Sequence, residues 1–185
     1  GQINTVFLIT SGSTISEGNG AAFTTLLSNE LLGNISISNQ NLNVNSGTIS
    51  VDDANLLSAT TTGTVTASIT TTESVSELTT LTETSNAYTI VIPEAAVSAS
   101  DLNAINNATT VAVDITNVTS ITSSSLADLG ILSTAIENNE FLDDSGITTF
   151  DSTIAVSDTT IDATTLASTI DKYDFLNGLN TTLMT

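Results

Sequence analysis

Carboxylates are the only chemically active side chains that this sequence carries in number. It has 20 Asp and Glu residues, one basic residue, Lys172, and no His, Cys or Trp. A general base near neutral pH would have to be Lys172 or a carboxylate with a raised pKa. A serine nucleophile would lack a histidine to activate it. We therefore expect a protein without enzyme activity.

Two groups of acidic residues have the composition of a cation site. Asp52 and Asp53 are adjacent in a predicted turn, and Glu140, Asp143 and Asp144 lie in the stretch ENNEFLDDSG. Carboxylate oxygens, with Asn and carbonyl oxygens beside them, are the ligands that Ca²⁺ takes. Neither an EF-hand loop nor a nonapeptide Gly-Asp repeat is present, and solvated turn residues are the alternative interpretation. Ca²⁺ is the one ion suggested, and no organic cofactor is predicted.

Four asparagines match the N-glycosylation pattern Asn-x-Ser/Thr, which makes them candidate modification sites. They are Asn34, Asn107, Asn117 and Asn180. A chain rich in Asn, Ser and Thr also produces such matches by chance, so both interpretations stay open.

The net charge of −19 excludes several classes of partner. Nucleic-acid binding needs cationic side chains that replace phosphate counterions, and anionic membrane surfaces need the same. No apolar run approaches the length that crosses a bilayer, so membrane insertion is not expected. Such a surface instead attracts cations and is expected to keep the protein soluble.

The elements that would position these residues follow a repeated apolar pattern. Segments starting at Leu42, Ile90 and Ile154 each carry apolar residues at offsets 0, 2, 7, 9 and 12. Alternation over i and i+2 places two side chains on one face of a strand. Each seven-residue unit is therefore predicted to be a short strand followed by a polar turn. This predicts a mainly β fold, β-solenoid-like or β-sandwich, with one or two short helices.

Two segments have helical rather than strand spacing. Ser98 to Asn107 has a possible capping Ser and apolar residues three apart, which predicts one or two helical turns. Ser123 to Leu142 is the strongest helix candidate, although Gly130 weakens it. Between them, Val111 to Thr122 is predicted to be a strand that passes into a corner.

The first residues differ from the rest, and we place a boundary after residue 32. Residues 1–32 are expected to form a strand segment or cap, and residues 33–185 a repeat-built β domain. The continuous apolar run at Thr5, Val6, Phe7, Leu8 and Ile9 predicts a strand buried on both faces. Such a strand pairs within its own chain, or it completes the sheet of a neighbouring copy.

Two later stretches, VSASDLNAINNATTVAVDITNVTSIT and SGITTFDSTIAVSDTTIDATTLASTID, carry a resemblance to a known family. They resemble the Thr/Asp-rich tandem repeats of large secreted surface proteins of marine cyanobacteria and similar bacteria, over residues 42–170. The stretch SEGNGAAFT, within residues 7–27, looks like the opening strands of a Calx-β or other Ig-like module. The resemblance implies extracellular or cell-surface placement and a structural or adhesive role.

Composition and resemblance together lead to three functional hypotheses. The first is an extracellular structural protein whose copies self-assemble into a filament, fibre or surface layer through strand contacts. The second is an adhesion module that binds glycans or a cell surface, with or without Ca²⁺. The third is an ice-binding protein, because Thr-x-Thr spacing occurs between Thr60 and Thr84.

Overall fold

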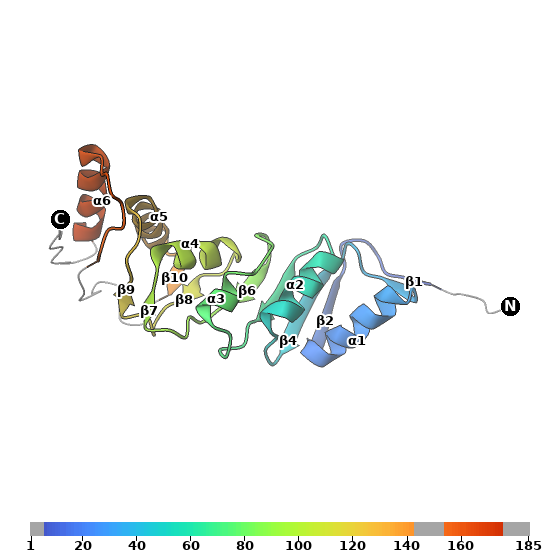
Figure 1. Ribbon diagram of the computed structural model, residues 1–185. Coiled ribbons are helices and arrows are strands. Elements are labelled where there is room, and N and C mark those ends of the chain that lie inside the picture. The colour runs from blue at the N-terminus through green and yellow to red at the C-terminus, as the bar shows by residue number, and fades with distance from the viewer. Residues whose placement is uncertain (1–5, 143–153, 176–185) are drawn as a thin grey trace. The chain divides into compact units, whose positions relative to one another are not determined.

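The computed structural model describes residues 6–142 and 154–175, in which short strands alternate with helices (Figure 1). Every strand pair in this part of the chain is parallel. The chain divides into two compact units, which we describe separately.

The expectation of a mainly β, solenoid-like or sandwich architecture is wrong. Six helices occupy much of the described chain, and its strands form several small parallel sheets. Parallel strands need a crossover between them, and here helices supply several of those crossovers.

Unit 1 comprises Gly1–Glu73, Thr80–Ile90 and Ala108–Val111, and it is built on a four-stranded parallel sheet of order β2-β4-β5-β6. Helices α1 and α2 pack against each other and against strands of this sheet. A separate strand pair joins β1 to β3. The elements are β1 (Phe7–Leu8), β2 (Thr14–Asn19), α1 (Gly20–Leu31), β3 (Ile35–Ser36), β4 (Asn41–Ser46), α2 (Val51–Thr60), β5 (Val65–Ser68) and β6 (Ala87–Thr89).

Unit 2 comprises Ser74–Thr79, Val91–Asn107 and Ala112–Thr185, and its helices pack in chain order, α3 on α4, α4 on α5 and α5 on α6. Strands β7 and β9 form one parallel pair, and β8 and β10 form another. The elements are α3 (Val75–Leu78), β7 (Ala96–Val97), α4 (Ala99–Asn107), β8 (Val113–Asp114), β9 (Ser120–Ile121), α5 (Leu126–Glu137), β10 (Phe141–Leu142) and α6 (Ala163–Phe175).

The repeated apolar pattern marks the core in its first two copies only, and it belongs to two kinds of element. In the copy that starts at Ile154 no apolar position is fully buried, and Ala163 is exposed. In its first two copies every apolar position is buried, including Leu57 and Ile105 at offset 15. Offsets 9, 12 and 15 are three apart and lie on the inward faces of α2 and α4. The pattern is therefore a strand followed by a helix, because spacing by three suits a helix and not a strand.

Four of the helices begin at the same short motif, a serine followed three residues later by an acid. In each case the serine Oγ accepts a hydrogen bond from the backbone N–H of the acidic residue, which caps the helix. The pairs are Ser50 and Asp53, Ser74 and Glu77, Ser98 and Asp101, and Ser125 and Asp128.

The first backbone amide of each of these helices is bound by a side chain from further along the chain. Val51 N–H donates to Glu73 Oε1 at 3.1 Å, and Val75 N–H donates to Glu94 Oε1 at 2.8 Å. Ala99 N–H donates to Ser124 Oγ, and Leu126 N–H donates to Asp158 Oδ2. The partners are 19 to 32 residues apart, so each helix start is joined to a later segment.

Candidate functional site

The predicted assembly strand forms β1 and pairs within its own chain. Phe7 lies opposite Ile35 in the parallel pair with β3, and Phe7 N–H donates to the Asn34 carbonyl at 2.9 Å. Phe7 is 68% exposed and Leu8 is 84% exposed, so the expected burial on both faces is wrong. Thr5 lies outside the described residues.

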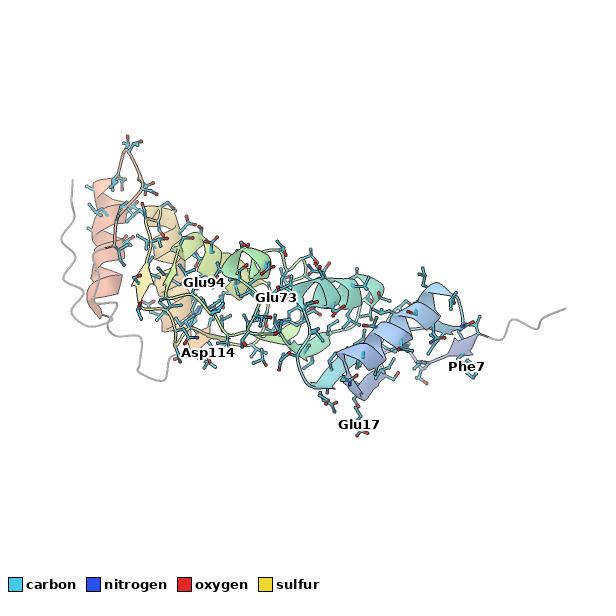
Figure 2. The ribbon with its side chains drawn as sticks, turned by 60° about the horizontal axis from the view of Figure 1, so that its bottom comes forward. Phe7, Glu17, Glu73, Glu94 and Asp114 are labelled. Atoms are coloured by element: carbon cyan, nitrogen blue, oxygen red, sulfur yellow. The ribbon has the colours of Figure 1, made fainter. Side chains whose placement is uncertain are left out.

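Further exposed apolar side chains belong to the same region of unit 1. Helix α1 ends at Leu31, and the chain turns through Gly33, at φ +71°, directly into β3. Leu31 and Leu32 are both largely exposed. Figure 2 labels Phe7 on β1, near the end of α1. We call Val6, Phe7, Leu8, Leu31 and Leu32 the N-terminal apolar surface.

The chain is anchored to unit 1 immediately after β1. Gln40 is almost fully buried, and its Nε2 donates to the Thr10 carbonyl at 3.2 Å and to Asn39 Oδ1 at 2.7 Å. Ile9 is half-buried. The exposed part of the predicted assembly strand therefore lies at Val6, Phe7 and Leu8.

One of the two edge strands of the four-stranded sheet, β2, is protected against pairing with a second copy. Glu17 has a positive φ of 66°, and the register with β4 shifts between Ile15 and Gly18. A bulge and an exposed acid are two features that keep an edge strand from pairing. Strand β1 has neither feature.

The acids predicted to bind Ca²⁺ have local roles where they are described, at a helix start or as hydrogen-bond acceptors. Asp52 and Asp53 lie in the first turn of α2, where negative charge favours a helix N-terminus. Glu140 accepts from Asn106 Nδ2 at 2.6 Å and from Asn138 Nδ2 at 3.1 Å. Asp143 and Asp144 lie outside the described residues, and elsewhere the described chain brings no three such ligands together. The Ca²⁺ site stays a prediction.

The candidate glycosylation sites differ in their accessibility. Asn34 Nδ2 donates to Asn29 Oδ1, and Asn117 Nδ2 donates to the Ile92 carbonyl at 3.0 Å, so a glycan at either position would disturb a bonded amide. Asn107 is exposed at the end of α4. Asn180 lies outside the described residues.

Unit 2 holds a cleft of about 450 Å³ between α4, α5 and α6. Amides from α4 line one wall, among them Asn103, Asn106 and Asn107. Helix α5 contributes Ile131, which is exposed, and hydroxyl groups line the α6 side. This volume lies in the range of small-molecule sites.

Asn103 is the buried polar residue of this cleft. It is 7% exposed, and its Nδ2 donates to the Asp128 carbonyl at 2.9 Å. Its Oδ1 is buried and accepts no hydrogen bond from any described residue. An unsatisfied buried acceptor costs about 1–3 kcal/mol, so a donor supplied from outside would be stabilising.

The charges around the cleft are few and acidic. Glu140 is the single ionisable residue among the described residues that line it. Nearby, Asp162 precedes α6, and its pKa is lowered by hydrogen bonds from the backbone N–H and the hydroxyl of Thr165. An anionic ligand would therefore meet repulsion and no cationic partner in the described lining.

The comparisons with known proteins return nothing similar. No protein-family model, no curated protein and no solved structure matches this chain. The resemblance to secreted repeat proteins therefore stays an expectation. No helix in the described chain has the length and apolar character needed to cross a membrane.

Sequence reasoning missed the cleft and the helix-start contacts. The cleft combines asparagines of α4 with residues of α5 and α6 that are tens of positions away in the sequence. No local residue spacing therefore predicts it. The helix starts did carry a signal, since Ser-x-x-Asp/Glu occurs at residues 50, 74, 98 and 125. That spacing is the known capping pattern.

Proposed function

We propose that this chain is a non-enzymatic extracellular structural protein whose copies associate through the N-terminal apolar surface. The observation that carries the proposal is the exposure of Phe7 and Leu8 on a strand with one paired edge. Five of the eight large exposed apolar residues of the described chain belong to this surface. Exposed apolar side chains favour association, because burying them removes them from water.

Strand geometry supports addition of a second strand at β1. The pair β1-β3 has two strands in the described chain, so the edge of β1 away from β3 has no strand partner there. An unpaired edge offers backbone N–H and C=O groups to a strand of another copy. The bulged edge of β2 does not offer the same continuous ladder.

Composition supports the structural role and predicts how association responds to salt. A chain with a single basic residue and no Cys offers trypsin few sites and no thiol chemistry, which suits exposure outside the cell. Copies that each carry a charge of −19 repel one another until salt screens them. Association is therefore expected to strengthen as ionic strength rises.

Sedimentation velocity with negative-stain electron microscopy tests this proposal on the full chain. We expect the assembled fraction to grow with protein concentration and from about 0.1 M to about 1 M NaCl. The double substitution Phe7→Ser with Leu8→Ser is expected to abolish assembly. Leu56→Ser is the matched control, because Leu56 is 51% exposed on α2 of the same unit.

Two results would contradict the proposal. One is a monomer under all of these conditions, and the other is assembly that persists in the double variant. Adding millimolar Ca²⁺ at matched ionic strength separates charge screening from a specific ion effect. Assembly that requires Ca²⁺ itself would favour the adhesion hypothesis.

A further inference from the structure

We propose that the cleft between α4, α5 and α6 is a binding site for a neutral saccharide of one or two sugar units. This inference is independent of self-assembly, because the cleft belongs to unit 2 and the N-terminal apolar surface belongs to unit 1. It assigns a recognition role to residues that the structural proposal does not use.

The lining matches the hydrogen-bonding character of sugar hydroxyls. Each sugar hydroxyl both donates and accepts, and an amide side chain offers both kinds of group. Asn107 presents such an amide from α4, whereas the hydroxyls of Ser168 and Thr169 on α6 already donate to the Thr165 carbonyl, so their oxygens act as acceptors. No hydrogen bond within the described chain engages the side chain of Asn107, which leaves its amide available.

Asn103 has a buried side-chain oxygen, Oδ1, that lacks a hydrogen-bond donor among the described residues. Its Nδ2 is held by the Asp128 carbonyl, which fixes the side chain, while Oδ1 is buried with no donor among the described residues. That oxygen has almost no exposed surface, so an O–H group of a ligand at this inner wall would reach it only if the Asn103 side chain shifts toward the cleft. A ligand with acceptors alone would gain nothing from such a shift.

The charges of the described lining residues favour a neutral ligand. Among the described residues of the lining none is basic, so carboxylate or phosphate ligands would lack a counter-charge there and would face Glu140. Both Glu140 oxygens already accept from asparagine amides, which leaves the carboxylate less available to a cationic ligand. Neutral hydroxyls fit without the desolvation of an unpaired charge.

Apolar side chains of α5 form one wall of the cleft, and such a wall suits the apolar face of a sugar ring. Ile131, which is 54% exposed, lies on α5 beside Ala127 and Ala135 along the cleft. A sugar ring has an apolar face of C–H groups between its hydroxyls, and this wall would cover such a face. Burial of that face adds to affinity without any charged contact.

The test is titration of the ¹⁵N-labelled full chain with a panel of neutral mono- and disaccharides by NMR. The panel holds glucose, galactose, mannose, N-acetylglucosamine, maltose, lactose and diacetylchitobiose, with glucuronate and glucosamine as charged comparators. We expect at least one neutral sugar to bind with a Kd of about 1 mM or tighter. Its shifts should map to backbone amides of α4, α5 and α6, and charged comparators should bind at least about tenfold more weakly.

Substitutions at exposed residues separate binding from folding. Ile131→Trp fills the cleft and is expected to weaken binding more than about tenfold, whereas Asn107→Ala removes one hydrogen bond and should cost about three- to tenfold. Leu56→Trp is the matched control, since Leu56 has nearly the same exposure but lies in unit 1. The proposal is overturned if no neutral sugar binds below about 10 mM, if charged comparators bind as well, or if Ile131→Trp leaves affinity unchanged.

Discussion

The side chain of Thr109 pairs with both backbone groups of Tyr88. Its Oγ1 accepts from Tyr88 N–H at 2.9 Å and donates to the Tyr88 carbonyl at 2.8 Å. Both residues are buried, and the next residue, Thr110, donates its N–H to the Asn86 carbonyl. A threonine thus satisfies backbone groups of β6 that a further strand would otherwise bind, because buried backbone groups need partners.

Thr109→Val tests the energy of this contact. Valine keeps the shape of threonine but neither donates nor accepts, so two buried backbone groups of Tyr88 lose their partner. We expect the free energy of unfolding to fall by about 2–4 kcal/mol, measured by urea titration. Thr66→Val, on the exposed face of β5, should change it by less than about 0.5 kcal/mol. Equal effects at the two sites would show that the buried bonds contribute nothing.

Gly63→Ala should destabilise unit 1 through a direct clash with backbone. A Cβ atom at Gly63 would overlap the carbonyl group of Gln40, which cannot rotate away as a flexible side chain would. We expect a loss of about 1–3 kcal/mol in urea unfolding. Gly130→Ala is the opposite case, because its Cβ would meet only Thr169 Oγ1 at 3.9 Å, inside helix α5. Gly130→Ala should raise the free energy of unfolding by about 0.5–1 kcal/mol. A gain in stability from both substitutions would contradict the predicted clash at Gly63.

Glu73→Ala removes the partner of the first amide of α2. Val51 is buried, so its N–H would be left without a partner, and a negative charge near the helix N-terminus would be lost. We expect a decrease of about 1–2 kcal/mol in unfolding free energy. Glu73→Gln keeps an acceptor oxygen and should recover part of the loss. Glu83→Ala, an exposed change of the same kind, serves as the control.

Alkaline pH should destabilise unit 1 through Tyr88. Burial raises the pKa of Tyr88 to about 12, although a hydrogen bond with Ser58 acts in the opposite direction. The folded state favours the neutral phenol, so this contribution to stability is complete below pH 10. It is lost as pH rises towards 12, up to about 2.5 kcal/mol in all.

Urea unfolding at pH 9 to 12 measures this dependence directly. In the Tyr88→Phe variant we expect the part of the decline in unfolding free energy that comes from ionisation of Tyr88 to disappear. Spectrophotometric titration of a Tyr173→Phe variant follows Tyr88 as the single tyrosine. A phenol titrating near pH 10 in that variant would contradict the buried environment.

The sequence predicted two helices and most of the buried positions. Helix α5 begins at Leu126, capped by Ser125, and α4 begins at Ala99, both inside the predicted segments, because apolar spacing by three and capping serines act locally. The apolar positions from Leu42 to Leu57 and from Ile90 to Ile105 are buried as their regular spacing indicates. These features depend on neighbours within one or two helical turns.

The fold class was missed because short segments rich in Thr and Val favour strands by propensity alone. Helix α2 begins at Val51, where a capping serine and tertiary packing outweigh the β-branched side chain. Helix α1 was missed as well, since the Gly-rich stretch before it indicates a turn and not the cap that Asn19 provides. The cleft depends on packing between three helices, which no local pattern specifies.

The long-range bonds at the helix starts have a consequence for how the chain emerges from the ribosome. The first amide of α2 has its acceptor on Glu73, and that of α4 has its acceptor on Ser124, 22 and 25 residues away. The N-terminal bonding of each of these helices is therefore complete only once the residue 19 to 32 positions after its first residue has been synthesised. During translation the most recently formed helix is always the least protected, and each newly added segment secures the one made before it.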